Sequence, residues 1–380
     1  MGVGLDIAKK RPHWLYSIAG LKAICLIGIF IWHIGYVKSP DLGARCVEVF
    51  FVASGFLEAY RHHYDYTFTF SETAKFLKKK LTTFYPIHIV SLIIAVVLSL
   101  ATGAIIFDGQ TVCTIISFLT LTQSWFPSIS TSSLFNGVSW FLSTLIVCYA
   151  MTPFIAFITK KSRLTAKQHG SEFSGEIVLF LLLFIWRMFL EVSQILFPKA
   201  FGNYSLAVSP LIRLPEYAMA YVAGCIFIER QSVKRVQPSY FHSSLIEVAY
   251  CAVLTVLVIL NGGTSTLPGV APRGIFVLLF IFLIYLLAHG QGIISHLLSC
   301  LPFRLFAKIE MPFYMFHQVA IRLMTLPILI SSIPILSIRK AYTLTSFTLT
   351  IILSIGWMQF NKYIQKKCNT ERKACSAISR

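Results

Sequence analysis

Two ionisable side chains interrupt the first long apolar segment, GLKAICLIGIFIWHIG, in which Lys22 and His33 are eleven residues apart. In an α-helix this spacing is about three turns, so both side chains would lie on one face, about 16 Å apart along the axis. Such groups cost about 2.5–3.5 kcal/mol to insert into a membrane and mark functional sites. An imidazole can take the proton of a hydroxyl group, and both residues would line a cavity. The simpler alternative is a lysine that snorkels to one surface and a histidine at the other.

The second apolar segment, ARCVEVFFVASGFLEAY, carries a glutamate near its start, Glu48. The loop before this segment is about seven residues long, so the first two helices would be neighbours, with Glu48 and His33 near the same boundary. A carboxylate that holds one imidazole nitrogen fixes the tautomer and raises the basicity of the ring. We therefore predict that Glu48 orients His33 as a general base. The alternative is a surface ion pair of Glu48 with Arg45 or Lys38.

Three later apolar segments carry further polar or aromatic candidates. Arg213 and Glu216, in SPLIRLPEYAMAYVAGC, would lie at similar depth; the arginine could bind a carbonyl or phosphate oxygen, or simply pair with the glutamate three residues on. Trp140, in GVSWFLSTL, could stack on a sugar or anchor the helix at the membrane surface. Tyr314 and His317, in IEMPFYMFHQVAIRLM, share a helix face and could support an acceptor site or form a structural pair.

A lysine cluster that includes Lys80 lies in KFLKKKLTTFYP, which we interpret as a cytoplasmic loop. Its charge would suit the phosphates of a nucleotide-bearing donor such as coenzyme A. A topogenic signal or a contact with anionic lipids is the alternative. The nine cysteines form no CxxC pair and no Cys/His cluster of metal-ligand spacing, so we predict no metal site.

The elements that position these residues must be membrane helices. Of the 380 residues, 56% are hydrophobic and 13% are charged, whereas a soluble domain carries about 25% charged residues. This composition excludes a soluble enzyme and a nucleic-acid binder. We predict an all-α polytopic integral membrane protein with about ten transmembrane helices, at about 14–36, 44–60, 86–107, 137–159, 176–197, 207–229, 243–262, 273–290, 311–333 and 340–360.

Lysine and arginine test this assignment, because they accumulate in cytoplasmic loops. The segments that would face the cytoplasm hold 23 of them and the opposite side holds six. The net charge of +18 is therefore read as a topology signal, with both termini cytoplasmic in a multi-pass protein of the plasma membrane. The segment 111–126 is short for a span, and we expect it to be re-entrant or interfacial on the outer side.

The order of these motifs resembles the membrane-bound acyltransferase family 3. The resemblance rests on GLKAICLIGIFIWH, VEVFFVASGFL, KKKLTTFYP, WFLSTL, RLPEYAMAYVAGC and IEMPFYMFH, in that order over nearly the whole chain. It implies one acyltransferase-like transmembrane domain over residues 1–380. Lys22 stands where the family has an arginine, and Glu310 where it has a serine.

The resemblance also implies an activity, the O-acylation of extracytoplasmic glycans, commonly with acetyl groups. Acyl-coenzyme A would be the donor substrate and would bind from the cytoplasm against Lys22 and Lys80. No bound cofactor is expected. His33, held by Glu48, would deprotonate a hydroxyl of a glycan or lipid-linked saccharide. Arg213 would contact the donor and stabilise developing oxyanion charge.

Two other functions are open on the sequence. Intramembrane Lys, Arg and Glu could line the pathway of a transporter or flippase for a lipid-linked or anionic sugar. No two halves of the chain resemble each other, which argues against that fold. A catalytically inactive relative that acts as a partner subunit is the third reading, because Lys22 replaces the arginine.

Overall fold

The computed structural model describes residues 15–36, 40–66, 68–125, 134–171, 173–202, 204–232, 239–262, 273–333 and 338–378. Within these ranges the regular elements are helices, and there is no strand. The ten longer helices among the described residues are α1 (Tyr16–His33), α2 (Pro40–His62), α3 (Phe70–Ala101), α6 (Trp140–Gln168), α7 (Ser174–Leu196), α9 (Pro210–Ser232), α10 (Tyr240–Gly262), α11 (Arg273–Ala288), α14 (Glu310–Met324) and α16 (Arg339–Ile378). The shorter helices are α4 (Gly109–Leu119), η1 (Gly137–Ser139), α8 (Pro198–Phe201), η2 (Leu206–Val208), α12 (Ile293–Leu298), α13 (Leu301–Lys308) and α15 (Pro327–Ser332).

Six of the helices are long and apolar enough to cross a bilayer, namely α1, α3, α6, α9, α10 and α16. The prediction of an all-α protein is confirmed for the described residues, and these six helices are candidate membrane spans by their length and composition. The other four predicted spans also form helices, α2, α7, α11 and α14. The first two carry several charged residues, and the last two have only 16 and 15 residues. The count of ten crossings therefore stays a prediction.

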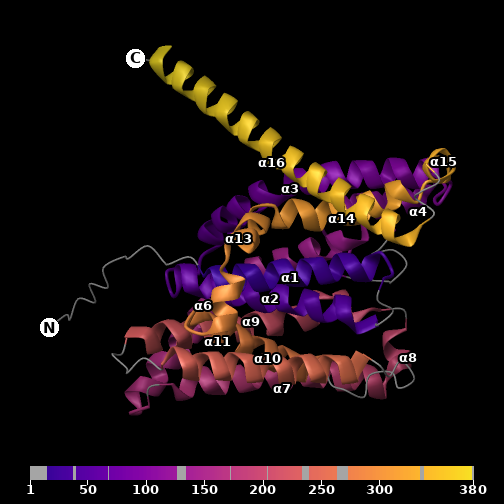
Figure 1. Cartoon of the computed structure of the whole chain (residues 1–380). Helices are drawn as coiled ribbons and strands as arrows, with labels where there is room; N and C mark the ends of the chain where they lie inside the picture. The colour runs from indigo at the N-terminus through magenta and orange to yellow at the C-terminus, as the bar shows by residue number, and fades with distance from the viewer. Residues whose placement is uncertain are drawn as a thin grey trace.

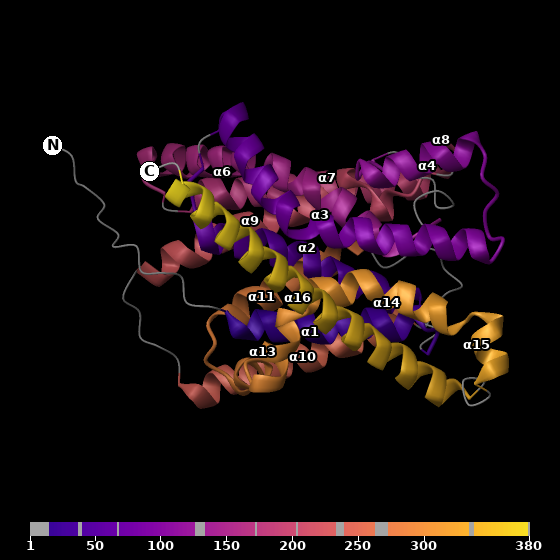
Figure 2. The same ribbon diagram turned by 90° about the horizontal axis from the view of Figure 1, so that it is seen from above.

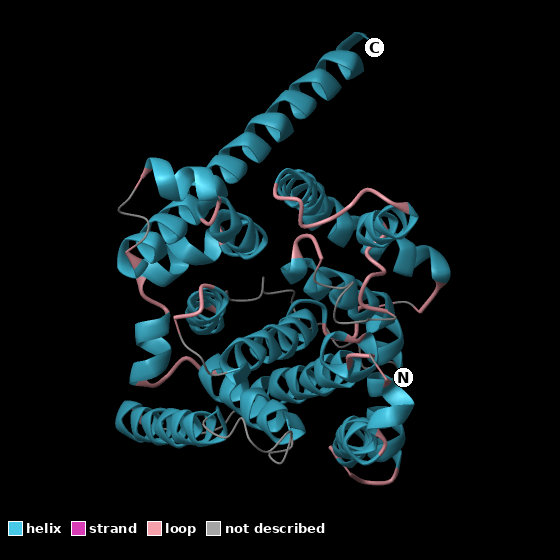
Figure 3. Ribbon diagram, turned by 90° about the vertical axis from the view of Figure 1, so that its right-hand side faces the viewer, coloured by secondary structure: helices cyan, strands magenta, loops and turns pink. Residues whose placement is uncertain are grey.

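The helices run side by side along a common axis, and the start of α1 and the end of α16 lie at the same end of the bundle (Figures 1 and 2). Viewed from one end of the bundle, several helices are seen nearly end-on, while the helix that ends at the C-terminus extends away from the others (Figure 3). Because α1 starts at one end, its last residue, His33, lies toward the opposite end. Which end faces the cytoplasm stays a prediction.

Helices α2 and α9 pack tightly at the centre because glycines face the partner backbone. A Cβ atom added at Gly55 would lie 2.1 Å from the carbonyl oxygen of Tyr217, and one at Gly224 would lie 2.9 Å from that of Phe56. Small residues at membrane-helix contacts permit this close approach, since lipid-exposed helices gain little from burying apolar surface alone. The buried face of α9 thereby fixes the depth of the polar residues near its start.

The lysine segment folds differently from the prediction. It belongs to α3 rather than to a loop, because Thr69 caps this helix and accepts a hydrogen bond from the backbone N–H of Glu72 at 3.3 Å. In the segment 111–126, residues 111–119 belong to α4, an eleven-residue helix capped by Asp108, whose Oδ1 accepts a 2.8 Å hydrogen bond from Thr111 N, and residue 126 lies outside the described residues. The described part of that segment is too short to cross a bilayer.

Candidate active site

The end of α1 brings His33 against His317 of α14, with their ring centroids 5.1 Å apart. His317 is fully buried, whereas His33 is partly accessible. On α14 the rings of Phe313 and Tyr314 pack on the two sides of His317, at centroid distances of 6.4 and 5.7 Å. Two imidazoles from distant parts of the sequence therefore meet in an otherwise apolar region, and the predicted shared face of Tyr314 and His317 is confirmed.

The hydrogen bonds of His317 fix its tautomer. Its Nδ1 lies 2.7 Å from the backbone oxygen of Tyr314. A carbonyl oxygen only accepts, so Nδ1 must carry the hydrogen, and the neutral ring bears its lone pair on Nε2. This Nε2 is buried and has no hydrogen-bond partner among the described residues. A buried imidazole with a free lone pair can accept a proton or a hydroxyl hydrogen bond.

The segment before α6 forms a wall against the histidine helix. The hydroxyl of Tyr314 donates to the carbonyl of Val138 at 2.9 Å, and the backbone N–H of Val138 donates to Gln318 Oε1 at 3.2 Å. Asn136 Nδ2 donates to the carbonyl of Met315 at 3.0 Å. These bonds hold α14 and its histidine in one register against η1, which precedes Trp140.

The same wall carries buried hydrogen-bond acceptors without partners. Gln123 Nε2 donates to Ser139 Oγ at 3.2 Å, and that hydroxyl donates to the carbonyl of Asn136 at 2.8 Å. The side-chain oxygens of Gln123 and Asn136 have no partner among the described residues. Buried polar atoms are nearly always hydrogen-bonded in a complete complex. These two oxygens and His317 Nε2 are three buried acceptors that could each accept a hydrogen bond from a hydroxyl group.

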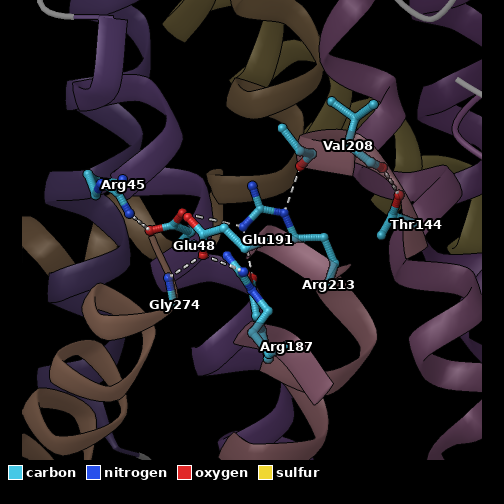
Figure 4. A network of polar contacts seen from close by, with 10 residues as sticks. Arg45, Glu48, Thr144, Arg187, Glu191, Val208, Arg213 and Gly274 are labelled. Atoms are coloured by element: carbon cyan, nitrogen blue, oxygen red, sulfur yellow. Dashed lines mark hydrogen bonds and ion pairs between the residues drawn. The ribbon is translucent and has the colours of Figure 1, made fainter. Parts of the chain in front are cut away.

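The predicted pairing of Glu48 with His33 is wrong. Glu48 is fully buried, and its Oε2 lies 2.6 Å from Arg45 Nη1, while its Oε1 lies 3.6 Å from Arg213 Nη1 (Figure 4). No described contact joins the carboxylate to His33, which faces His317 instead. The alternative prediction, a surface ion pair of Glu48 with Arg45, names the right partner. The pair is not at the surface, however, because both side chains are buried. A buried charge without a partner costs several kcal/mol, so the buried Glu48 carboxylate needs an arginine beside it.

Glu48 belongs to a network of three arginines and three glutamates. Arg213 pairs with Glu216 at 2.8 Å, as the helical spacing predicts, and Glu216 pairs again with Arg187 of α7 at 2.8 Å. Arg187 also binds Glu191 at 2.8 Å, and that carboxylate accepts a 3.0 Å hydrogen bond from the backbone N–H of Gly274 (Figure 4). Equal numbers of both charges, held by α2, α7 and α9, make this network neutral as a whole.

Trp140 lies beside this network at the start of α6. Its ring stacks on Phe51 at 6.1 Å, and the guanidinium of Arg213 lies 5.9 Å from its centroid. Arg213 Nε also donates to the carbonyl of Ala207 at 2.9 Å. The contacts of the described residues thus bring Trp140, Arg213, Glu216 and Glu48 into one cluster.

The two predicted donor lysines lie elsewhere, each with a carboxylate. Lys22 Nζ lies 2.6 Å from Glu310 Oε1 at the start of α14, with both side chains only 16% and 22% exposed. Lys80 Nζ lies 2.6 Å from Glu58 Oε2 of α2 and over the ring of Tyr149 at 4.4 Å. Each lysine is therefore half of an interhelical ion pair.

Sequence reasoning missed the partners of these residues. Arg187 and Glu191 stand four residues apart in FLLLFIWRMFLEV, and this spacing in an apolar run is a signal for a buried helical pair. Glu58 gives a similar signal near the end of α2, where Tyr66 donates a 2.5 Å hydrogen bond to it. Gln123 and Asn136 lie in segments between helices and carry no comparable pattern.

Comparison with known proteins identifies the family of the chain. Residues 15–358 match a family model described as an acyltransferase domain, Acyl_transf_3. The chain is also similar to acyltransferase MdmB of Streptomyces mycarofaciens, with 28% identity over 158 residues. That alignment spans 37% of this chain and 38% of the relative, so the chain matches well under half of that protein's length. No solved structure shows significant similarity. The family match, which covers nearly the whole chain and includes every cluster above, shows that the chain belongs to the acyltransferase 3 family.

Proposed function

We propose that the protein is an integral-membrane O-acyltransferase. It transfers an acyl group, with acetyl the expected one, from acyl-coenzyme A on the cytoplasmic side to a hydroxyl of an extracytoplasmic or cell-surface glycan. The observation that carries the proposal is the contact of His33 with His317, at 5.1 Å between ring centroids, inside a bundle of apolar helices. Membership of an acyltransferase family supports the reaction class.

The chemical step needs one base and a path for one proton. The acceptor hydroxyl oxygen attacks the thioester carbonyl carbon while His33 takes the hydroxyl proton. The tetrahedral intermediate then collapses, the C–S bond breaks, and the protonated His33 returns the proton to the departing thiolate of coenzyme A. The products are an ester and free coenzyme A, so atoms and charge balance without a further reactant.

The proposed donor path runs along α1. Lys22 stands eleven residues before His33 on this helix, and its ammonium is partly accessible. A phosphate of the donor would compete with Glu310 for Lys22, and another would compete with Glu58 for Lys80 at the same end of the bundle. Arg213 completes the proposed donor contacts, and Glu48 and Glu216 hold its guanidinium in place.

The proposed acceptor site lies at the opposite end of α1. The unpartnered oxygens of Gln123 and Asn136 and the Nε2 of His317 would accept hydrogen bonds from sugar hydroxyls. Trp140 offers an aromatic face near Arg213 on which a sugar ring could stack. This polarity supports a polyhydroxylated acceptor over a purely apolar one.

The topology that this reaction requires is part of the proposal. Ten crossings with both termini in the cytoplasm would place the lysines of α3 beside the donor pool and His33 near the outer leaflet of the plasma membrane. The excess of Lys and Arg in the loops at one end supports this orientation.

The test is transfer of radiolabelled acetyl from acetyl-coenzyme A to glycan in membranes that contain the wild-type protein or His33→Ala. His242→Ala serves as the matched control, because His242 is exposed at the start of α10. We expect label with the wild type and the control, and its loss with His33→Ala at equal protein content in the membrane. Label that persists in His33→Ala excludes this histidine as the base, and no label in the wild type overturns the proposed donor or the reaction.

A further inference from the structure

A groove of about 360 Å³ runs between α1 and α16. Its apolar part is lined by Ile27, Phe30, Leu344 and Phe347, and its outer mouth by Tyr36 and Lys340. Apolar atoms make up nearly all of its accessible lining. A groove of this kind on a membrane helix pair fits a hydrocarbon chain.

The base of the groove packs against the aromatic residues of the candidate active site. Phe30 and Phe347 meet edge to face with centroids 5.2 Å apart, and both contact Phe313, at 6.1 and 5.5 Å. Phe313 in turn stacks parallel to the buried imidazole of His317. Phe30 and Phe347 line the groove and Phe313 lies between them and His317, so these aromatic rings separate the groove from the histidine pair.

The mouth of the groove is positively charged and lies at the same end as His33. Tyr36 follows His33 by three residues, directly after the end of α1. Lys340, in the first turn of α16, is exposed. Its ammonium forms no ion pair with a carboxylate of the described residues. The neighbouring Arg339 lies over the Tyr36 ring at 5.2 Å. A chain that lies in the groove would present an anionic head group to these cations.

We infer that this groove holds the lipid chain of an anionic lipid-linked saccharide and so presents the saccharide to His33. This inference rests on the proposed function and names its acceptor class. Lys340 binds the phosphate that joins lipid and sugar, and the groove binds the hydrocarbon. The mouth of the groove, at Tyr36 and Lys340, lies beside the end of α1 that carries His33. This position favours the proposed occupant over an ordinary membrane phospholipid, because only an acceptor gains from a head group held near the base.

The test is photolabelling of the full-length protein in nanodiscs with a polyprenyl phosphate that carries a diazirine in its chain. Leu344→Trp fills the groove, and Lys340→Gln removes the charge at its mouth. The matched controls on the same helix are Ile352→Trp and Lys362→Gln, because both residues are exposed and lie outside the groove. A photoreactive phosphatidylglycerol serves as the comparison lipid.

We expect labelled peptides from the groove helices, with labelling reduced about fivefold by Lys340→Gln, the usual effect of one basic residue near an anionic lipid head. Leu344→Trp should reduce it at least as much, and the two controls should leave it unchanged. Equal labelling by phosphatidylglycerol, or equal labelling of all variants, overturns the inference. Labelling does not require acyl transfer, so a protein that is labelled but transfers no acetyl overturns only the proposed function. A protein that transfers acetyl without groove labelling overturns only the groove assignment.

Discussion

Lys22 of α1 and Glu310 of α14 form an ion pair with 2.6 Å between Nζ and Oε1. At both positions the sequence departs from the family pattern that it resembles: a lysine stands in place of an arginine, and a glutamate in place of a serine. The carboxylate of Glu310 neutralises the lysine, with both side chains largely buried. A donor phosphate that binds Lys22 must therefore displace Glu310.

This competition predicts the effect of Glu310→Gln. The amide keeps the shape of the side chain but frees Lys22, so the KM for acetyl-coenzyme A should fall about two- to fivefold, the equivalent of a partly exposed ion pair. Steady-state kinetics in membranes measure it. Glu72→Gln is the control, because Glu72 forms an exposed pair with Lys75 at 2.8 Å. A higher KM in Glu310→Gln would instead assign Glu310 to the positioning of Lys22.

The His33–His317 contact predicts a role for His317 in the acyl-transfer step. His317→Phe keeps the buried ring but removes Nε2, so kcat should fall by about a hundredfold, within the usual range for proton transfer, while the KM for the donor stays unchanged. Tyr314→Phe is the control on the same helix, and removes only the 2.9 Å hydrogen bond to Val138. It should cost about 1 kcal/mol of stability and little activity. Equal loss of kcat in both variants would indicate that the histidine is structural.

The arginine–glutamate network predicts a strong effect on stability. Arg187→Met leaves the carboxylates of Glu191 and Glu216 buried without this partner, and breaking a buried pair costs about 3–5 kcal/mol. Thermal unfolding in detergent should show a much lower Tm than for the wild type. Glu72→Gln, in its exposed pair, should change the stability by less than about 1 kcal/mol. An unchanged Tm in Arg187→Met would contradict the structural role of the network.

Much of the fold and part of the site could be predicted from the sequence, for different reasons. Helices follow from apolar runs, and Tyr314 and His317 share a face because of their spacing alone. The partner of His33 could not be predicted, since His317 lies far along the chain and only the packing of α1 against α14 brings the rings together. Glu48 was misplaced for the same reason: proximity along the chain suggested His33, whereas buried arginines of α2 and α9 satisfy the carboxylate better.

The glycine contact between α2 and α9 gives a prediction independent of catalysis. An alanine in a helix is about 1 kcal/mol better than a glycine. At Gly55 the added methyl group would lie 2.1 Å from the carbonyl oxygen of Tyr217, so Gly55→Ala should lower the Tm. Gly356→Ala is the control, because nothing lies within 4 Å of an added Cβ there and its Tm should be equal or higher. Equal effects at both positions would contradict the close packing.

The polar network has a further consequence for how the chain enters the membrane. Each contributing helix carries its own arginine with a glutamate one turn later: Arg45 with Glu48, Arg187 with Glu191 and Arg213 with Glu216. During synthesis each of these arginines can therefore be neutralised within its own helix, before the neighbouring helices exist. Lys22 differs, because its carboxylate partner is made only when most of the chain has been translated. The ion pair of α1 can therefore form only after α14 has been synthesised.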